Sequence, residues 1–175
     1  MSVATMSESA GVCFQLSEDH TMVRDMVRKL ATDEIAPKAA EYDHSREFPW
    51  DNIRKMAELG LMGVTVPEAF GGAGMDTLAY VLVIEEISKA CASTGVITAV
   101  QNSLGCYPIL AFGTEEQKKK YLPLIASGQK IAAYALTEPN SGSDAGAMKT
   151  TCVRDGDHWV LNGQKNWITN STAAE

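Results

Sequence analysis

Apolar residues in the first part of the chain recur with the spacing of helices that bury one face. Met22, Val23, Met26, Val27 and Leu30 follow one another at helical intervals. Ser17 can cap this helix through its hydroxyl group, and Glu18 and Asp19 suit its positive N-terminal end. Pro37 should kink or restart the helix, because proline cannot donate the backbone hydrogen bond that a helix interior needs.

The pattern continues with helices separated by turn residues. A helix should open at Phe48-Pro49 and run to Leu59, where Gly60 suits a left-handed cap. The Gly- and Pro-rich stretch 66–74 should be a loop. Asp76 should then cap a helix through Ile87, whose nearly continuous apolar positions 78–84 predict burial on most sides. Further helices are expected at 93–111, interrupted by Pro108, and from a Thr114-x-x-Gln117 capping box to 127–128, perturbed by Pro123.

After residue 130 the pattern changes from helical to extended. A short apolar run at 131–136 precedes a loop at 138–146 that is crowded with Pro, Asn, Ser, Gly and Asp. Strands are expected at 150–154, 158–161 and 164–169, joined by turns at 155–157 and 162–163. A meander of about three strands leaves an edge unpaired, which indicates an incomplete second domain.

Composition narrows the class of protein. The chain has 175 residues, of which 45% are hydrophobic, so it can build a core. Its 15 basic and 22 acidic residues give a net charge of -7, which disfavours nucleic acid and anionic lipid as partners. The basic run Lys118-Lys119-Lys120 is interpreted as a solvated helix face. Membrane insertion is not expected, because the richest apolar run, 78–84, ends at Glu85-Glu86.

Cysteine and histidine give no sign of a metal site or a nucleophile. Cys13, Cys91, Cys106 and Cys152 form no C-x-x-C pair, and His20, His44 and His158 stand apart from one another. Reduced thiols and ordinary histidines are therefore expected. The first 13 residues contain Glu8 and no arginine, so no mitochondrial transit peptide is visible.

Two segments carry candidate chemistry. Small side chains in Tyr134–Gly146 would let the backbone approach a flat ring or a pyrophosphate, although such a loop is often only a turn. It lacks the G-x-G-x-x-G pattern of a Rossmann loop. Trp167-Ile168-Thr169 offers an indole plane that can pack beside a flavin ring, although a tryptophan on a strand is more often part of a core.

Together these segments point to a known family. The string Tyr134–Gly146, followed by Asn162–Asn170, closely resembles the flavin-binding signature of the acyl-CoA dehydrogenases, and the run Ala92–Val96 looks most like the short-chain branch. The resemblance extends from Leu16 to Glu175. It implies an α+β fold, in which an N-terminal α-helical bundle precedes the start of an antiparallel β-barrel. The expected parts are an unstructured N-terminus (1–15), a helical domain (16–130) and the beginning of the middle β-domain (131–175).

The resemblance also assigns roles to residues. It implies FAD as cofactor, with Tyr134, Leu136, Thr137, Gly142, Ser143, Trp167, Ile168 and Thr169 in contact with it. Ser143 should also reach the pantetheine of the acyl-CoA, and Asn102 and Leu104 should border its acyl chain. No catalytic residue is assigned, because the family's glutamate base belongs to a C-terminal helical bundle. Glu138 lies in the loop motif and is not expected to take that role.

The expected function is α,β-dehydrogenation of short-chain acyl-CoA in fatty-acid β-oxidation, with this chain inactive by itself. The family implies electron-transferring flavoprotein as partner, a homotetramer at full length and the mitochondrial matrix as location. One alternative is an acyl-CoA oxidase or flavin monooxygenase of the same fold. Others are a non-catalytic fragment that docks on dehydrogenase subunits, and an incomplete gene product without a role of its own.

Overall fold

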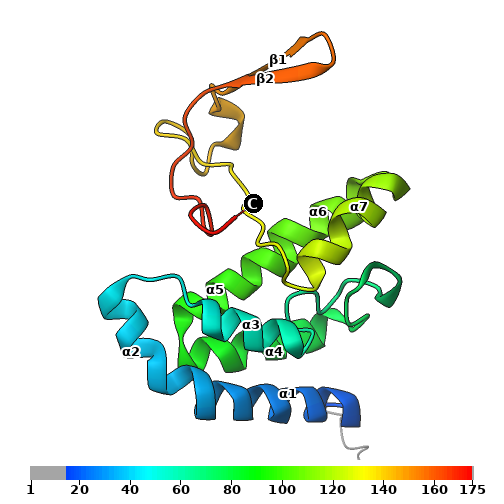
Figure 1. Ribbon diagram of the computed structural model, residues 1–175, viewed down its shortest axis with the longest axis vertical. Helices are drawn as coiled ribbons and strands as arrows, with labels where there is room; N and C mark the ends of the chain where they lie inside the picture. Colours follow the sequence, from blue (N-terminus) through cyan, green and yellow to red (C-terminus); the bar gives the residue numbers. More distant parts are fainter. Residues whose placement is uncertain (1–14, 175) are drawn as a thin grey trace, which may run out of the picture.

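Helices form the body of the molecule, and a two-stranded hairpin projects from it (Figure 1). The computed structural model describes residues 15–174. The helices are α1 (Glu18–Leu30), α2 (Ala36–Ser45), α3 (Trp50–Glu58), α4 (Thr77–Ala90), α5 (Ala92–Val100), α6 (Tyr107–Phe112) and α7 (Glu115–Ala126). π-helical turns at Ala31–Ile35 and Gln101–Cys106 join α1 to α2 and α5 to α6, and single 3-10 turns lie at Glu68–Phe70 and Ala145–Ala147. The strands β1 (Thr151–Asp155) and β2 (His158–Asn162) follow, so the predicted α+β class is confirmed.

Polar side chains fix the starts of three helices. Ser17, Asp76 and Thr114 each accept a hydrogen bond from a backbone N–H in the first turn of α1, α4 and α7. At α7 the bond is reciprocal, because the Gln117 side chain also accepts from the N–H of Thr114 at 2.8 Å. These N–H groups have no partner within the helix, so each cap stabilises the helix start that the sequence predicted.

The core lies where α4 packs between α1 and α5. Its most deeply buried side chains include Val27, Ile35, Ile53, Met56, Val83 and Ile87. The prediction that α4 is buried on most sides is wrong. Leu78 and Val81 on its other face are 44% and 50% exposed, because α1 and α5 cover only one side of the helix.

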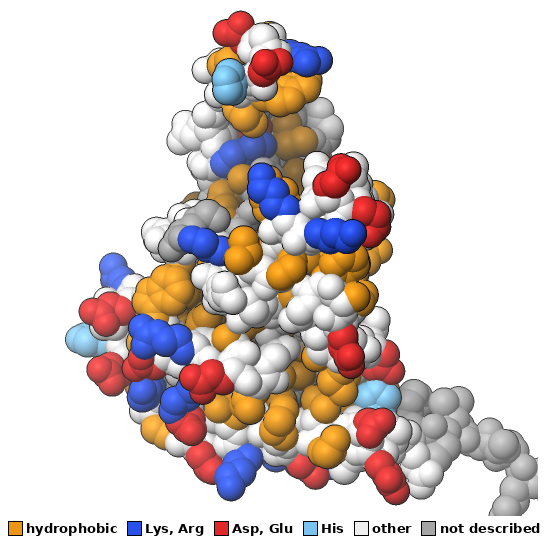
Figure 2. Space-filling model, turned by 45° about the vertical axis from the view of Figure 1, so that its right-hand side comes forward, with side chains coloured by type: hydrophobic (Ala, Val, Ile, Leu, Met, Phe, Trp, Pro, Cys, Tyr) orange, Lys and Arg blue, Asp and Glu red, His pale blue; other side chains and the backbone are white. Residues whose placement is uncertain are grey.

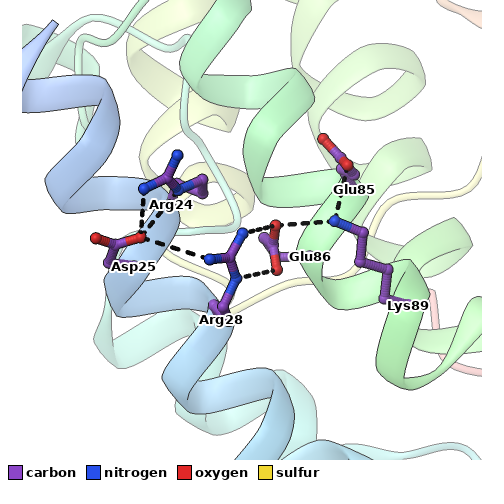
Figure 3. A network of polar contacts seen from close by, with 6 residues as sticks. All are labelled: Arg24, Asp25, Arg28, Glu85, Glu86 and Lys89. Atoms are coloured by element: carbon purple, nitrogen blue, oxygen red, sulfur yellow. Dashed lines mark hydrogen bonds and ion pairs between the residues drawn. The ribbon is translucent and has the colours of Figure 1, made fainter. Parts of the chain in front are cut away.

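A buried carboxylate joins α1 to α4 (Figure 3). Glu86 is 4% exposed, and the Arg28 guanidinium donates to both of its carboxylate oxygens at 3.0 and 2.9 Å. Lys89 adds a third donor at 3.0 Å. The hydrogen bonds from Arg28, followed by those from Lys89, lower the pKa of Glu86 to about 2, although burial opposes this shift.

This pair makes stability depend on pH in a defined direction. Because the pKa of Glu86 falls from 4.5 to about 2 on folding, its contribution is complete above pH 4.5 and is lost as the pH falls toward 2. We expect Glu86→Gln to lower the free energy of unfolding at pH 6 by about 2 kcal/mol, less than the shift alone implies because solvent screens the half-exposed Arg28. Urea unfolding at pH 3 should show a smaller difference in the free energy of unfolding between the variant and the wild-type chain.

Glu85→Gln is the matched control for this measurement. Glu85 lies beside Glu86 and also pairs with Lys89, but its side chain is 52% exposed. Exposed pairs contribute little, so this variant should match the wild-type chain at both pH values. If the difference in the free energy of unfolding between Glu86→Gln and the wild-type chain stays constant from pH 6 to pH 3, the assigned role of the carboxylate is contradicted.

The hairpin is exposed along its whole length, and the predicted third strand is absent from the described residues. Strands β1 and β2 pair from Thr151 opposite Asn162 to Asp155 opposite His158, across a turn in which Gly156 has a φ of 57°. Residues 164–169 do not form a strand, and the Asn-Gly step at 162–163 is therefore no hairpin turn. Within this segment, Trp167 has a φ of 59°, which lies in the left-handed region and interrupts an extended backbone.

One helical segment is longer and more apolar than the run 78–84 on which the expectation about membrane insertion was based. Continuous helix from Ala92 to Phe112 is long and apolar enough to cross a membrane, by length and composition only. The core helix of a soluble protein meets the same criteria, and 44% of the apolar window of this segment is buried within the protein.

On the face drawn in Figure 2, acidic and basic side chains are interspersed over the helical part.

Candidate functional site

Both predicted flavin motifs line one cleft. It has a volume of about 240 Å³ and lies between the C-terminal end of α5 and two segments outside helices and strands, 131–137 and 163–170. Its lining residues are Val100, Leu104, Tyr134, Leu136, Thr137, Trp167, Ile168 and Thr169. The structure therefore brings Thr137 and Trp167, which are 30 positions apart in the sequence, to the same site. A wider hollow of about 650 Å³ between α2 and the α4–α5 junction contains none of these motif residues.

Direct hydrogen bonds hold the two halves of the cleft together. The N–H of Asn166 donates to the carbonyl oxygen of Thr137 at 2.8 Å. Beside this bond, the Lys165 ammonium donates to the carbonyl oxygen of Leu136 at 2.9 Å. At the far end of the first segment, the Asn170 side chain donates to the carbonyl oxygen of Ala132 at 3.1 Å. The segment 131–137 is thus bonded to the segment 163–170 at both of its ends.

A buried glutamine fixes the first segment to the helical body. The Gln101 amide is fully buried and donates to the carbonyl oxygens of Ile125 and Lys130, both at 2.8 Å. Its oxygen accepts from the N–H of Ala132 at 2.9 Å. Gln101 therefore positions the start of the motif against the end of α7. Sequence reasoning missed this residue, although a glutamine within an otherwise apolar helix was a usable signal, because buried amides require partners.

Trp167 is presented to solvent instead of being packed in a core. Its side chain is 90% exposed, and its φ of 59° is unusual for a bulky residue. Tyr134 on the facing segment is 44% exposed. Within the part of the chain that the structure describes, the N–H groups of Leu136 and Thr137 have no hydrogen-bond acceptor. Exposed aromatic planes beside free N–H donors fit the flat ring and polar edge of an isoalloxazine.

Glu138 is a structural carboxylate. It accepts hydrogen bonds from the Lys165 ammonium at 2.8 Å and from the N–H groups of Lys149 and Thr150 at 2.6 and 3.1 Å. Hydrogen bonds from Lys165, and then from Thr150 and Lys149, lower the pKa of Glu138 to about 2. A general base with so low a pKa and its oxygens engaged would be ineffective near neutral pH. The residues that line the cleft include no carboxylate and no imidazole.

The remaining predicted residues do not all reach the cleft. Gly142 and Ser143 lie in an exposed turn and are not among its lining residues. Leu104 lines the cleft, whereas Asn102 is 2% exposed and lies in the core. The Asn102 side chain accepts from the N–H of Val64 and donates to two carbonyl oxygens, so its hydrogen bonds join α5 to the loop after α3.

Two family models match consecutive parts of the chain. The model of the acyl-CoA dehydrogenase N-terminal domain matches residues 17–129, and the model of the middle domain of the same family matches residues 133–175. The mitochondrial short-chain specific acyl-CoA dehydrogenase of Bos taurus is 52% identical over 160 residues. These residues are 91% of this chain and 39% of the bovine protein, so the chain spans about two fifths of its relative's length.

Solved structures are similar to this chain in both sequence and fold. An acyl-CoA dehydrogenase complexed with FAD from Bacillus anthracis is 44% identical with a TM-score of 0.85, over 91% of this chain and 28% of that one. A chain in the structure of the electron transferring flavoprotein of Acidaminococcus fermentans is 44% identical with a TM-score of 0.89, over 93% of this chain and 43% of that one. The sequence motifs, the helical and two-stranded fold and these likenesses are mutually consistent.

Proposed function

Because the chain belongs to the acyl-CoA dehydrogenase family, which uses FAD, we propose that its cleft binds the isoalloxazine ring of this cofactor. The observation that carries the proposal is the meeting of Thr137 and Trp167 at one cleft, with the indole exposed. Trp167, Ile168 and Thr169 would pack along one side of the ring. The other segment would supply its edge contacts.

The lining residues support distinct tasks within this site. Tyr134 is an exposed aromatic side chain at the cleft, and Thr137 adds a hydroxyl group. Free N–H groups on Leu136 and Thr137 can donate to the polar edge of the ring. Gly142 and Ser143 lie in the exposed turn, where we propose that both contact FAD and that Ser143 also reaches the pantetheine of the acyl-CoA.

Short-chain acyl-CoA is the proposed substrate class, and α,β-dehydrogenation is the proposed reaction of the full-length protein. The short-chain specific bovine relative, at 52% identity, supports this substrate. When bound, FAD supplies the acceptor for the hydride that leaves the β-carbon. Leu104, 41% exposed at the cleft, would contact the acyl chain. An adjoining hollow of about 460 Å³ shares Leu104 and Tyr134 with the cleft and offers apolar room for a short chain.

Partner and location are proposed from the relatives. The similar chain in the structure of an electron transferring flavoprotein supports such a flavoprotein as electron acceptor. Similar proteins occur both in a mammalian mitochondrion and in bacteria, and we propose the mitochondrial matrix and a homotetramer for the full-length protein. Cell fractionation and size-exclusion chromatography of that protein would check the two proposals.

The test of the proposed site uses the 175-residue chain itself. We expect the purified chain, incubated with FAD and freed of excess, to show the visible absorption of bound flavin. It should not reduce a dye with butyryl-CoA, because the cleft contains no carboxylate to remove the α-proton. A colourless chain would contradict the proposed cofactor site, and substantial turnover would contradict the assignment of the base to a residue outside this chain.

A further inference from the structure

Lys165 occupies a central position between the two halves of the cleft. Its ammonium donates to the Leu136 carbonyl oxygen at 2.9 Å and to the Glu138 carboxylate at 2.8 Å, and it lies 3.4 Å from the sulfur of Met148. The first two contacts bracket Thr137, which lines the cleft. In the sequence, Lys165 is two positions before Trp167, which lines the opposite side. The Lys165 side chain therefore bonds to the residue before Thr137 and to the residue after it. The backbone of Lys165 belongs to the segment that carries Trp167.

The partner of this lysine is itself firmly held. The Glu138 side chain is 5% exposed, and its carboxylate also accepts from the N–H groups of Lys149 and Thr150. Its backbone forms two hydrogen bonds with Ser141, at 2.8 and 3.1 Å, which close the turn of the motif. Lys165 consequently bonds to a fixed anchor. A buried carboxylate also needs a cationic partner to offset the loss of its hydration.

Neighbouring contacts show why the lysine matters for spacing. The bond from the N–H of Asn166 to the carbonyl oxygen of Thr137 is a single backbone hydrogen bond between the segments 131–137 and 163–170, which form no ladder. The hairpin between these segments is exposed along both of its strands. Beside the bond from Asn166, Lys165 adds the charge-assisted hydrogen bonds that join the two segments.

We infer that Lys165 is a positioning residue of the cleft, which holds Trp167 at a fixed separation from Thr137 through the Leu136 carbonyl and the Glu138 carboxylate. Lys165 is not among the residues that line the cleft. The inference rests on the proposed function, since the ligand whose fit depends on this separation is the flavin ring.

The first experiment needs no ligand. In Lys165→Met the N–H of Asn166 should exchange with solvent about tenfold faster than in the wild-type chain, because the link that supports its bond to Thr137 is lost. NMR-detected hydrogen exchange measures this amide directly. Lys149→Met is the matched control, because this exposed lysine contacts the same carboxylate only through its backbone N–H. It should leave the exchange rate unchanged.

The second experiment adds FAD and follows the quenching of its fluorescence. Lys165→Met should bind FAD about tenfold more weakly, and Lys149→Met should bind like the wild-type chain. Lys165→Arg keeps the charge and its donors, so it should recover part of the affinity. If the lysine acts through Glu138, Lys165→Met combined with Glu138→Gln should bind no more weakly than the weaker single variant.

The outcomes separate the inference from the proposed function. Equal exchange at Asn166 in Lys165→Met and Lys149→Met overturns the inference, and so does equal FAD affinity in the two variants. Additive losses in the double variant also overturn it. If the wild-type chain binds no FAD while Lys165→Met still accelerates exchange, the proposed cofactor site fails and the link between the segments stands. Thermal unfolding of the helical part, which contains neither Lys165 nor Glu138, shows that each variant is folded.

Discussion

Gly72→Ala is expected to destabilise the helical part of the chain by at least about 3 kcal/mol, because the added methyl group has no space. A Cβ at this position would overlap the carbonyl oxygen of Val66 and lie 2.6 Å from that of Gly63. Both are backbone atoms, which cannot move aside as the end of a side chain can. The loop must therefore distort or open.

The loop around Gly72 is part of the core. The N–H of Ala73 donates to the carbonyl oxygen of Gly63, and the N–H of Met75 to that of Val64, both at 2.9 Å. These bonds fold the loop on itself and bury Val64 and Val66 at 1% and 0% exposure. Distortion at Gly72 would break this pairing and expose apolar side chains. The loss is a large share of the roughly 5–15 kcal/mol that stabilises a typical domain.

Thermal unfolding followed by far-ultraviolet circular dichroism measures the effect. The midpoint should fall by at least about 8 °C in Gly72→Ala. Gly142→Ala is the control, since a Cβ at this exposed glycine would meet no atom within 4 Å. Its free energy of unfolding should change by less than about 0.5 kcal/mol. Equal midpoints for the two variants would show that the loop tolerates a side chain at Gly72.

Local chemistry made the helix starts predictable. Ser17, Asp76 and Thr114 each satisfy backbone N–H groups within three residues of themselves, so their role can be inferred without knowledge of the fold. The turn at Gly156 was predictable for the same reason, because glycine adopts a positive φ at low cost.

The predictions that were wrong concern features that depend on residues distant in the sequence. The apolar run at 78–84 gave no information on how many helices would cover α4, and Leu78 and Val81 remain exposed. The segment 164–169 after the Asn-Gly step was predicted to be a strand, but a strand needs a partner edge, and Asn166 instead bonds to the backbone at Thr137. Tertiary contacts decided both cases.

The candidate site shows the same limit. Motif residues such as Thr137 and Trp167 could be named from the sequence because two short strings occur in order. The holding roles of Gln101 and Lys165 could not be assigned from those strings, because their partners lie 24 to 29 positions away: Ile125 for Gln101, and Leu136 and Glu138 for Lys165. A polar side chain within an apolar helix, such as Gln101, signals that it needs partners but does not reveal which distant carbonyl groups it bonds to.

Trp167→Ala is expected to weaken FAD binding about thirtyfold without a loss of stability. An aromatic contact contributes roughly 0.5–1.5 kcal/mol beyond its buried area, and covering the indole with the flavin adds a burial contribution. Because the side chain is 90% exposed in the ligand-free chain, its removal deletes few contacts within the protein. The unfolding midpoint should therefore match that of the wild-type chain, while the dissociation constant for FAD rises.

Fluorescence titration with FAD measures the affinity, and Trp159→Ala is the matched control. Trp159 is also exposed, at 62%, but it lies on β2 and does not line the cleft. We expect this variant to bind FAD as tightly as the wild-type chain, which rules out a general effect of removing an exposed indole. Equal affinity in both tryptophan variants would mean that the flavin ring does not pack against Trp167, whereas a lowered unfolding midpoint in Trp167→Ala alone would assign the indole a structural role.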